Sequence, residues 1–195
     1  MRNTQHWTLA VSLLFGSLTS LTSDPAQAQV QNFRLKSFRL PNLCFDVANN
    51  RVANGTSIQV AKCKQKGHPA QTWTQGALMN PRCAPAMQEC LYQIKLAANP
   101  KYCIDYTNST KPPGAGSGLQ LWLCRDPRYG DSAYWGSTLG QSAEASVMYP
   151  AVPNVGIFGG FSPSISLKAR EGERIALIPF STKRYYYWVT EYTDY

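Results

Sequence analysis

A carboxylate, an amide and an indole occur within one short stretch of the chain, between Cys103 and Cys124. Apolar residues alternate with polar ones on both sides of a turn rich in Pro, Gly and Ser, which predicts two antiparallel strands joined as a hairpin. If the two cysteines lie opposite each other as a disulfide, Asp105 falls opposite Trp122 on the same face. Gln120, two residues before Trp122, shares that face and adds an amide.

These three groups suit a sugar. A pyranose presents a face of C–H groups that packs on an aromatic ring, and a rim of hydroxyls that donate to a carboxylate. The alternative is structural: Trp122 fills a hydrophobic gap while Asp105 caps a turn. From this stretch alone both interpretations stay open.

The same order of parts occurs earlier in the chain and favours the functional interpretation. Cys44 and Cys103 lie 59 residues apart, and each begins a Cys-x-Asp motif. In both copies a Gln-x-x-x-Cys motif follows, and then a closing tryptophan, Trp73 or Trp135. An internal repeat of this length indicates that one supersecondary unit is used more than once.

The N-terminus has the features of an export signal. Arg2 precedes an apolar stretch, and Ala26-Gln-Ala28 offers small residues where a signal peptidase cuts. We expect residues 1–28 to be a signal peptide and residues 29–195 to form a single domain of a secreted or periplasmic protein. An uncleaved anchor is the alternative, but the stretch is short for a bilayer and contains Ser, Thr and Gly.

Six cysteines follow the signal, and an even number in an exported chain predicts disulfides. The repeat predicts the pairs Cys44 with Cys63, Cys103 with Cys124, and Cys83 with Cys90. A zinc site is the alternative, and it is weakened by the absence of Cys-x-x-Cys and by a single histidine, His68, in the mature chain. We expect no metal and no cofactor.

Short alternating segments without a convincing helix predict an all-β fold of three pseudo-repeats. In a third, worn copy, Ile175–Phe180 stands for the second strand of the hairpin, and Tyr187-Trp188 stands for the closing aromatic pair. Three repeats close into a barrel, which removes the open edges that two would leave. The expected lobes lie at about 33–75, 92–136 and 161–190, with connecting loops at 76–91 and 137–160.

The combination of Cys-x-Asp, Asn54-Gly-Thr, Gln-x-x-x-Cys and Gln71-x-Trp resembles the ricin B-type lectin repeat. The resemblance extends from Phe33 to Trp135 and is faint in the C-terminal third. It implies a β-trefoil with disulfide-stapled hairpins, in which each repeat can carry one shallow sugar site. It also implies that Trp73 and Trp135 pack in the core.

In family members that bind galactose-type sugars, the site consists of four parts. These are the acid of Cys-x-Asp, the Gln and the aromatic before the second Cys, and an Asn-Gln pair before the closing Trp. The second repeat matches the first three parts and lacks the Asn-Gln pair. The carbohydrate-binding residues that the resemblance implies there are Asp105, Gln120, Trp122, Asp131 and Ser132.

The first repeat departs further from the family pattern. Asp46, Gln59 and Gln71 match, and they make a weaker second site. Ala61 stands at the stacking position and Ala70 at the Asn position. Losing an aromatic platform removes about a kcal/mol or more from a weak, exposed interaction. The third repeat keeps none of the polar groups.

The formal net charge of +8 is interpreted as serving plain solubility, with anionic partners such as acidic polysaccharide or phospholipid headgroups as the alternative. We expect no nucleic-acid partner, because the chain is exported and has no recognised motif, and no membrane span after the signal. The aromatic run Lys183–Trp188 is interpreted as a barrel strand, with docking of a protein partner as the alternative. Asn54 and Asn108 also begin glycosylation acceptor patterns.

We expect no catalysis, because His68 has no matched nucleophile and Asp46 and Asp105 belong to different lobes. The first functional hypothesis is a secreted carbohydrate-binding protein with one plausible sugar site in the second repeat and a glycan or glycoconjugate as partner. The second is a non-enzymatic protein-interaction module on a degenerate lectin scaffold, such as an accessory subunit that docks a catalytic partner. The third is a trefoil protease inhibitor that places a loop at 81–90 in an enzyme cleft.

Overall fold

The computed structural model describes residues 31–78, 91–107, 112–124, 134–139, 146–152, 156–157, 161–179 and 187–193. Several expectations concern residues outside these ranges and stay predictions. They are the signal peptide, the Cys83–Cys90 pair, Asp131, Ser132, Asn108 and most of the C-terminal aromatic run.

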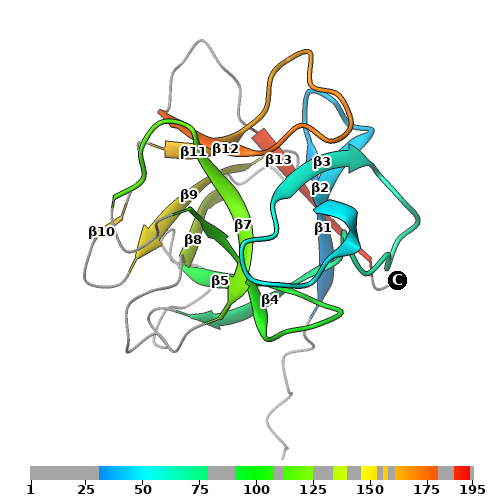
Figure 1. Cartoon of the computed structure of the whole chain (residues 1–195), viewed down its shortest axis with the longest axis horizontal. Helices are drawn as coiled ribbons and strands as arrows, with labels where there is room; N and C mark the ends of the chain where they lie inside the picture. Colours follow the sequence, from blue (N-terminus) through cyan, green and yellow to red (C-terminus); the bar gives the residue numbers. More distant parts are fainter. Residues whose placement is uncertain are drawn as a thin grey trace, which may run out of the picture.

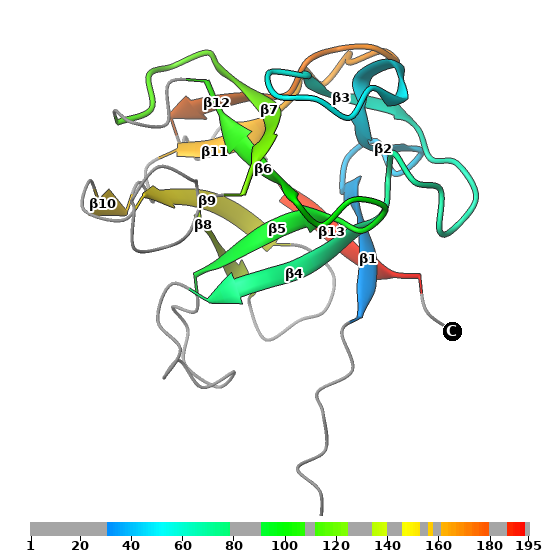
Figure 2. The same cartoon turned by 60° about the horizontal axis from the view of Figure 1, so that its bottom comes forward.

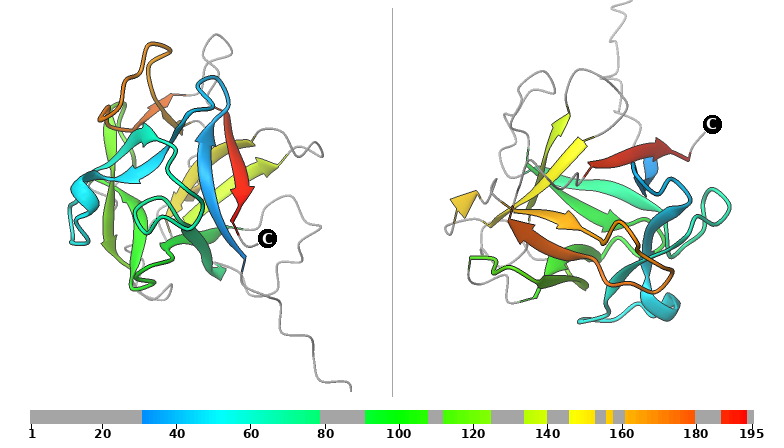
Figure 3. Two further views of the ribbon diagram at one scale, coloured as in Figure 1. Left: turned by 90° about the vertical axis from the view of Figure 1, so that its right-hand side faces the viewer. Right: turned by 90° about the horizontal axis from the view of Figure 1, so that it is seen from above.

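Six strands of the described chain close into an antiparallel barrel (Figures 1 and 2). In order around the barrel they are β1 (Asn32–Ser37), β4 (Trp73–Leu78), β5 (Tyr92–Leu96), β8 (Tyr134–Leu139), β9 (Ser146–Val152) and β13 (Tyr187–Tyr192). The first and last described strands complete the ring, since Phe33 in β1 pairs with Tyr192 in β13 (Figure 3, left). Each barrel strand is thereby paired on both sides, which is how barrels avoid exposed edges.

Three hairpins cover one end of this barrel (Figure 2). They are β2 (Leu43–Val47) with β3 (Ile58–Lys62), β6 (Tyr102–Tyr106) with β7 (Ser117–Leu123), and β11 (Phe161–Ser164) with β12 (Ala176–Pro179). A short 3-10 helix, η1 (Ala48–Asn50), follows β2, and β10 (Gly156–Ile157) pairs with β9. We call β1–β4 lobe 1, β5–β8 lobe 2, and β9–β13 lobe 3.

The three lobes contact one another in a cyclic pattern through the turns of their hairpins. Each turn contains a glycine with positive φ, at +78°, +89° and +89°, a conformation that L side chains rarely adopt. Each glycine donates its N–H to the outer strand of the next lobe. The pairs are Gly55 to the Leu121 oxygen (2.9 Å), Gly116 to Leu177 (2.8 Å) and Gly172 to Val60 (2.8 Å). The same contact made three times in sequence gives the fold its pseudo-threefold symmetry.

This cycle confirms the predicted alignment of the third copy. Val60, Leu121 and Leu177 accept the same bond, so the segment around Leu177 occupies the place that the sequence assigned to it. Alternation along the strands is as expected, since Phe33 and Leu35 in β1 are buried and their neighbours Asn32, Arg34 and Lys36 are partly exposed. The all-β expectation is confirmed.

The closing tryptophan of each lobe lies in the core. Trp73 and Trp135 are completely buried and Trp188 is 2% exposed, which confirms their predicted structural role. The Nε1 of Trp135 donates to the Ile104 oxygen and the Nε1 of Trp188 to the Pro163 oxygen, both at 3.0 Å. The Nε1 of Trp73 has no hydrogen-bond partner in the described part of the chain.

Two of the predicted disulfides are present. Cys44 bonds to Cys63 and Cys103 to Cys124, with Cα–Cα separations of 5.0 and 5.1 Å. Each staples the two strands of one hairpin together. The described cysteines therefore contain no free thiol, and the zinc alternative does not apply to these four.

The stretch 137–160, expected to be a connecting loop, contains strands. It begins with the end of β8 and holds β9 and β10, so lobe 3 starts at β9 rather than near residue 161. Its Gly and Pro content hides this, yet Pro150 is buried opposite Trp135 in the ladder. The expected loop at 76–91 is likewise shortened, because β4 extends to Leu78.

Candidate functional site

The hairpin of lobe 2 brings the predicted carboxylate, amide and indole to one face. Asp105 pairs with Gln120, and Cys103 pairs with Trp122. The expectation that Asp105 lies directly opposite Trp122 is therefore wrong by two residues along the partner strand. The reason is that the disulfide is diagonal, because Cys103 bonds to Cys124, two residues beyond its ladder partner. An offset of two keeps all three side chains on the same face.

Asp105 and Gln120 are deeply set, being 2% and 9% exposed, while Trp122 is partly exposed. The Oδ1 atom of Asp105 accepts the backbone N–H of Tyr106 at 2.8 Å, which orients the carboxylate. In contrast, the Gln120 side chain makes no hydrogen bond with any part of the described chain. A polar floor beside an accessible aromatic ring is an arrangement that can hold a ligand with both hydroxyls and C–H groups.

Tyr106 is the buried neighbour behind this face. Burial raises the pKa of its phenol well above the ordinary value, and the negative charge of Asp105 raises that pKa further. The phenol therefore stays neutral throughout the physiological range.

The ring of Trp122 is braced by lobe 1. A Cβ on Gly55 would lie 4.0 Å from the Cζ3 atom of Trp122, so the lobe 1 turn lies beside the ring. Sequence reasoning missed this contact, because the two residues belong to different repeats.

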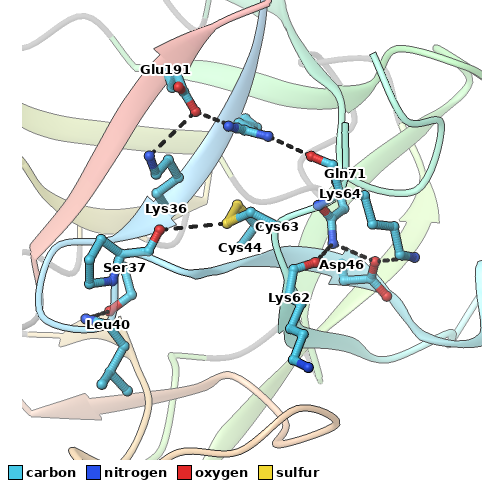
Figure 4. The surroundings of a disulfide bond; sticks show 12 residues. Lys36, Ser37, Leu40, Cys44, Asp46, Lys62, Cys63, Lys64, Gln71 and Glu191 are labelled. Carbon is cyan, nitrogen blue, oxygen red and sulfur yellow. Dashed lines mark hydrogen bonds and ion pairs between the residues drawn. A yellow bond between two sulfur atoms is a disulfide. The ribbon is translucent and has the colours of Figure 1, made fainter. Parts of the chain in front are cut away.

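The equivalent face of lobe 1 is closed by its own side chains (Figure 4). The Oδ2 atom of Asp46 accepts from Lys64 Nζ and from Gln71 Nε2, both at 2.9 Å. The Oδ1 atom of Asp46 accepts from Gln59 Nε2 at 3.5 Å. Asp46 is 3% exposed, and Ala61 leaves no ring over it.

Lys64 is the residue of this cluster that sequence reasoning missed. Its backbone N–H donates to Gln71 Oε1 at 2.8 Å, so both its main chain and its ammonium group hold the network together. The three predicted residues Asp46, Gln59 and Gln71 do come together, but their hydrogen bonds are directed at one another. The sequence feature that could have revealed it is a lysine directly after the second cysteine. That lysine reaches Asp46 only because of the hairpin geometry.

The face of lobe 3 has no comparable polar set among the described residues. Ser164 pairs with Ala176, and these two stand where Asp105 and Gln120 stand in lobe 2. Ile178 takes the place of the indole. The expectation for this lobe agrees with the side chains present.

A second charged group lies on the barrel and adjoins the lobe 1 cluster, since Arg34 Nη1 donates to the Lys64 oxygen at 2.7 Å. Glu191 in β13 forms ion pairs with Arg34 and, at 3.6 Å, with Lys36 in β1. The hydrogen bond from Arg34 lowers the pKa of Glu191 below its usual value, against the effect of burial, and the charges of Arg34, Lys36 and Lys66 lower it further. This cluster joins the first and last strands of the barrel.

Two features are absent from the described residues. These residues contain no helix of the length and apolar character needed to cross a membrane. They also contain no group of three or more His, Cys, Asp or Glu side chains placed to hold a metal ion.

No protein-family model and no curated protein matches the sequence. Solved structures do resemble this one. The designed threefold-symmetric protein ThreeFoil has a TM-score of 0.59 at 13% identity, covering 82% of this chain and 97% of that protein. The agglutinin of Rhizoctonia solani has a TM-score of 0.58 at 9% identity, covering 87% and 99% respectively. The Macrolepiota procera ricin B-like lectin, solved in complex with lactose, has a TM-score of 0.56 at 13% identity, covering 83% and 94%.

Identities this low speak to architecture alone. The structural similarity, together with the closed barrel, the three hairpins and the cyclic contacts between lobes, establishes that this chain has the β-trefoil fold of the ricin B-type lectins.

Proposed function

We propose that this chain is a secreted carbohydrate-binding protein with one sugar site, on the hairpin of lobe 2. The observation that carries the proposal is the contrast between two equivalent glutamines. Gln59 donates to Asp46 within lobe 1, whereas the more deeply buried Gln120 leaves its amide unbonded beside Asp105. The amide atoms of Gln120 are not among the fully buried, unpartnered side-chain atoms of the described chain, so water still reaches them, and a ligand hydroxyl would replace that water.

The binding mode follows from the positions of the three side chains. The C–H face of a pyranose packs on the partly exposed ring of Trp122. Hydroxyls at one edge of the sugar donate to Asp105 and accept from Gln120, which lie side by side in the ladder. Asp131 and Ser132, expected near this edge, would add an acceptor and a hydroxyl.

Two further considerations support the proposal. The signal peptide expected at 1–28 directs the chain out of the cytoplasm, and the two disulfides suit an oxidising compartment. The Macrolepiota procera lectin shares the fold and was solved with lactose, which supports a glycan or glycoconjugate as partner.

The test is retention of the purified mature chain on a printed glycan panel that includes lactose and N-acetylgalactosamine. Asp105→Asn removes a charge-assisted hydrogen bond of about 1.5–3 kcal/mol, which lowers affinity by about tenfold to a hundredfold. Trp122→Ala removes the ring under the sugar and should abolish retention. Asp46→Asn is the matched control, because the same acid in lobe 1 is already occupied by Lys64 and Gln71.

The proposal fails if Trp122→Ala and Asp105→Asn retain glycans as strongly as the wild-type chain does. It also fails if the wild-type chain retains no glycan while a pull-down from the native secretome recovers a protein. That second result would favour a docking module on a lectin scaffold instead.

A further inference from the structure

The hairpin turn of lobe 1 lies against the outer edge of β7, next to the candidate sugar site of lobe 2. Three hydrogen bonds hold it there. They run from Gly55 N–H to the Leu121 oxygen (2.9 Å), from Leu121 N–H to the Thr56 oxygen (2.7 Å), and from Leu123 N–H to Oδ1 of Asn54 (2.8 Å). Asn54 is therefore an exposed side chain in a fixed position.

The amide nitrogen of Asn54 has unused hydrogen-bonding capacity. Because the Leu123 N–H needs an acceptor, the oxygen of the Asn54 amide is committed to that bond and its two N–H donors are left over. Neither donor has a partner in the described part of the chain. The next residue, Gly55, lies beside the ring of Trp122, since a Cβ added to it would lie 4.0 Å from Cζ3. Two free donors thus border the aromatic surface on which a sugar would lie.

Asn54 and Asp105 flank β7 on opposite sides. The strand β6, which carries Asp105, pairs with one edge of β7, and the lobe 1 turn bonds to the other edge. Neighbouring strands are spaced by about 4.8 Å, and Leu123, which holds Asn54, lies three residues along β7 from Gln120, the partner of Asp105, so the acid and the amide lie at least about 10 Å apart. This span is wider than one pyranose ring and suits two linked units.

We propose that Asn54 donates a hydrogen bond to the second unit of a bound glycan, so that two lobes share the site and a disaccharide or longer chain binds better than a single sugar. The inference rests on the proposed function of the lobe 2 site. The unit on Trp122 contacts Asp105 and Gln120. The next unit extends across β7, where a hydroxyl, ring or linkage oxygen accepts from Nδ2 of Asn54.

The other two lobe boundaries do not offer this arrangement. The residue before the turn glycine is Ala115 in lobe 2 and Glu171 in lobe 3, and neither side chain has a donor when Glu171 is ionised. The positions of the indole are filled by Ile178 and Ala61. The donor amide of Asn54 therefore occurs at the boundary that also keeps the aromatic ring.

The substitution Asn54→Asp tests the proposal with little disturbance of the turn. It keeps the oxygen that accepts the Leu123 N–H and replaces the two donors by a second acceptor. Glu171→Gln, at the equivalent turn of lobe 3, is the matched control. The full mature chain should be produced in the periplasm of a bacterium, so that disulfides form and Asn54 is not glycosylated. The probes are lactose with galactose, together with other printed disaccharides and their non-reducing monosaccharides.

Asn54→Asp should weaken every retained disaccharide by about threefold to tenfold, as expected for one hydrogen bond, and leave the monosaccharides unchanged. Glu171→Gln should change neither, and thermal unfolding should show that both variants are folded. Equal loss of mono- and disaccharide, or no loss, would overturn the shared site while the effect of Trp122→Ala still supports the lobe 2 site. If Trp122→Ala and Asp105→Asn are also silent, the proposed function fails and the shared site with it.

Discussion

Comparing the closing tryptophans of the three lobes can show how much a buried hydrogen bond contributes to the stability of this core. Trp73 and Trp135 occupy equivalent positions and are both completely buried. The indole N–H of Trp135 donates to the Ile104 oxygen at 3.0 Å, whereas that of Trp73 has no partner in the described structure. Substitution of each by Phe removes the same atoms from equivalent surroundings.

The expected difference follows from the hydrogen bond, because the cost of the smaller ring is common to both variants. Trp135→Phe loses the bond and leaves the buried Ile104 carbonyl without it. Trp73→Phe loses no bond and removes an unpaired buried donor. We expect Trp135→Phe to be the more destabilised of the two by about 1–3 kcal/mol. For a chain of this size that corresponds to roughly 2–4 °C in Tm per kcal/mol.

The assay is equilibrium unfolding in guanidinium chloride with the disulfides intact, followed by circular dichroism. The unfolding midpoint should fall further for Trp135→Phe than for Trp73→Phe, with an unchanged dependence on denaturant. Trp188→Phe should resemble Trp135→Phe, because Trp188 Nε1 bonds to the Pro163 oxygen at 3.0 Å. Equal destabilisation by Trp73→Phe and Trp135→Phe would refute the reasoning.

Three more outcomes can be measured on the same chain. Replacing Cys44 and Cys63 together by Ala should cost about 3 kcal/mol of unfolding free energy, because the unfolded chain regains the closed loop, and calorimetry would show the loss. Glu191 has a folded-state pKa below its ordinary value of 4.5, so the stability that its ionised carboxylate contributes is complete above pH 4.5 and is lost as the pH falls through the folded pKa. The difference in unfolding free energy between wild type and Glu191→Gln should therefore shrink as unfolding is measured at lower pH. Lys64→Met should destabilise the chain, because the nearly buried Asp46 carboxylate loses its ion pair, while glycan retention by lobe 2 stays unchanged in the printed-panel assay.

Much of this trefoil was predictable because the information is repeated locally along the chain. The copies beginning at Cys44 and Cys103 have the same order of cysteine, acid, glutamine and tryptophan, and that repeated order paired the four described cysteines correctly. The alignment of Ile175–Phe180 with the second hairpin strand was equally recoverable, because alternating apolar residues persist after the cysteines are lost. Burial of Trp73 and Trp135 followed from the family resemblance.

Strand β9 shows where local patterns fail. Its sequence contains Pro150 within a Gly- and Pro-rich stretch, which is typical of a loop. It becomes a strand because β8 and β13 pair with its two edges, and those partners are supplied by the closure of the barrel.

The candidate site depends even more on contacts between distant segments. The cysteine positions indicate that two strands are joined, but they do not fix the register of the pairing, because a disulfide can be diagonal. In the structure Asp105 pairs with Gln120 rather than with Trp122. Lys64 lies 18 residues after Asp46 in the sequence, and the folding of the hairpin brings its ammonium group to the carboxylate.

The chain's own pattern was therefore sufficient for the architecture and for which residue types face outward in each repeat, since strand alternation and repeat spacing are local properties. Which hydrogen bonds the side chains of each face make was decided by the folded geometry, both within a lobe and between lobes. Lobe 1 uses its donors to satisfy its own acid, while lobe 2 leaves Gln120 unbonded and is bordered by Asn54 and Gly55 from its neighbour. These contacts join residues that are far apart in sequence, so only the folded molecule brings their chemistry together.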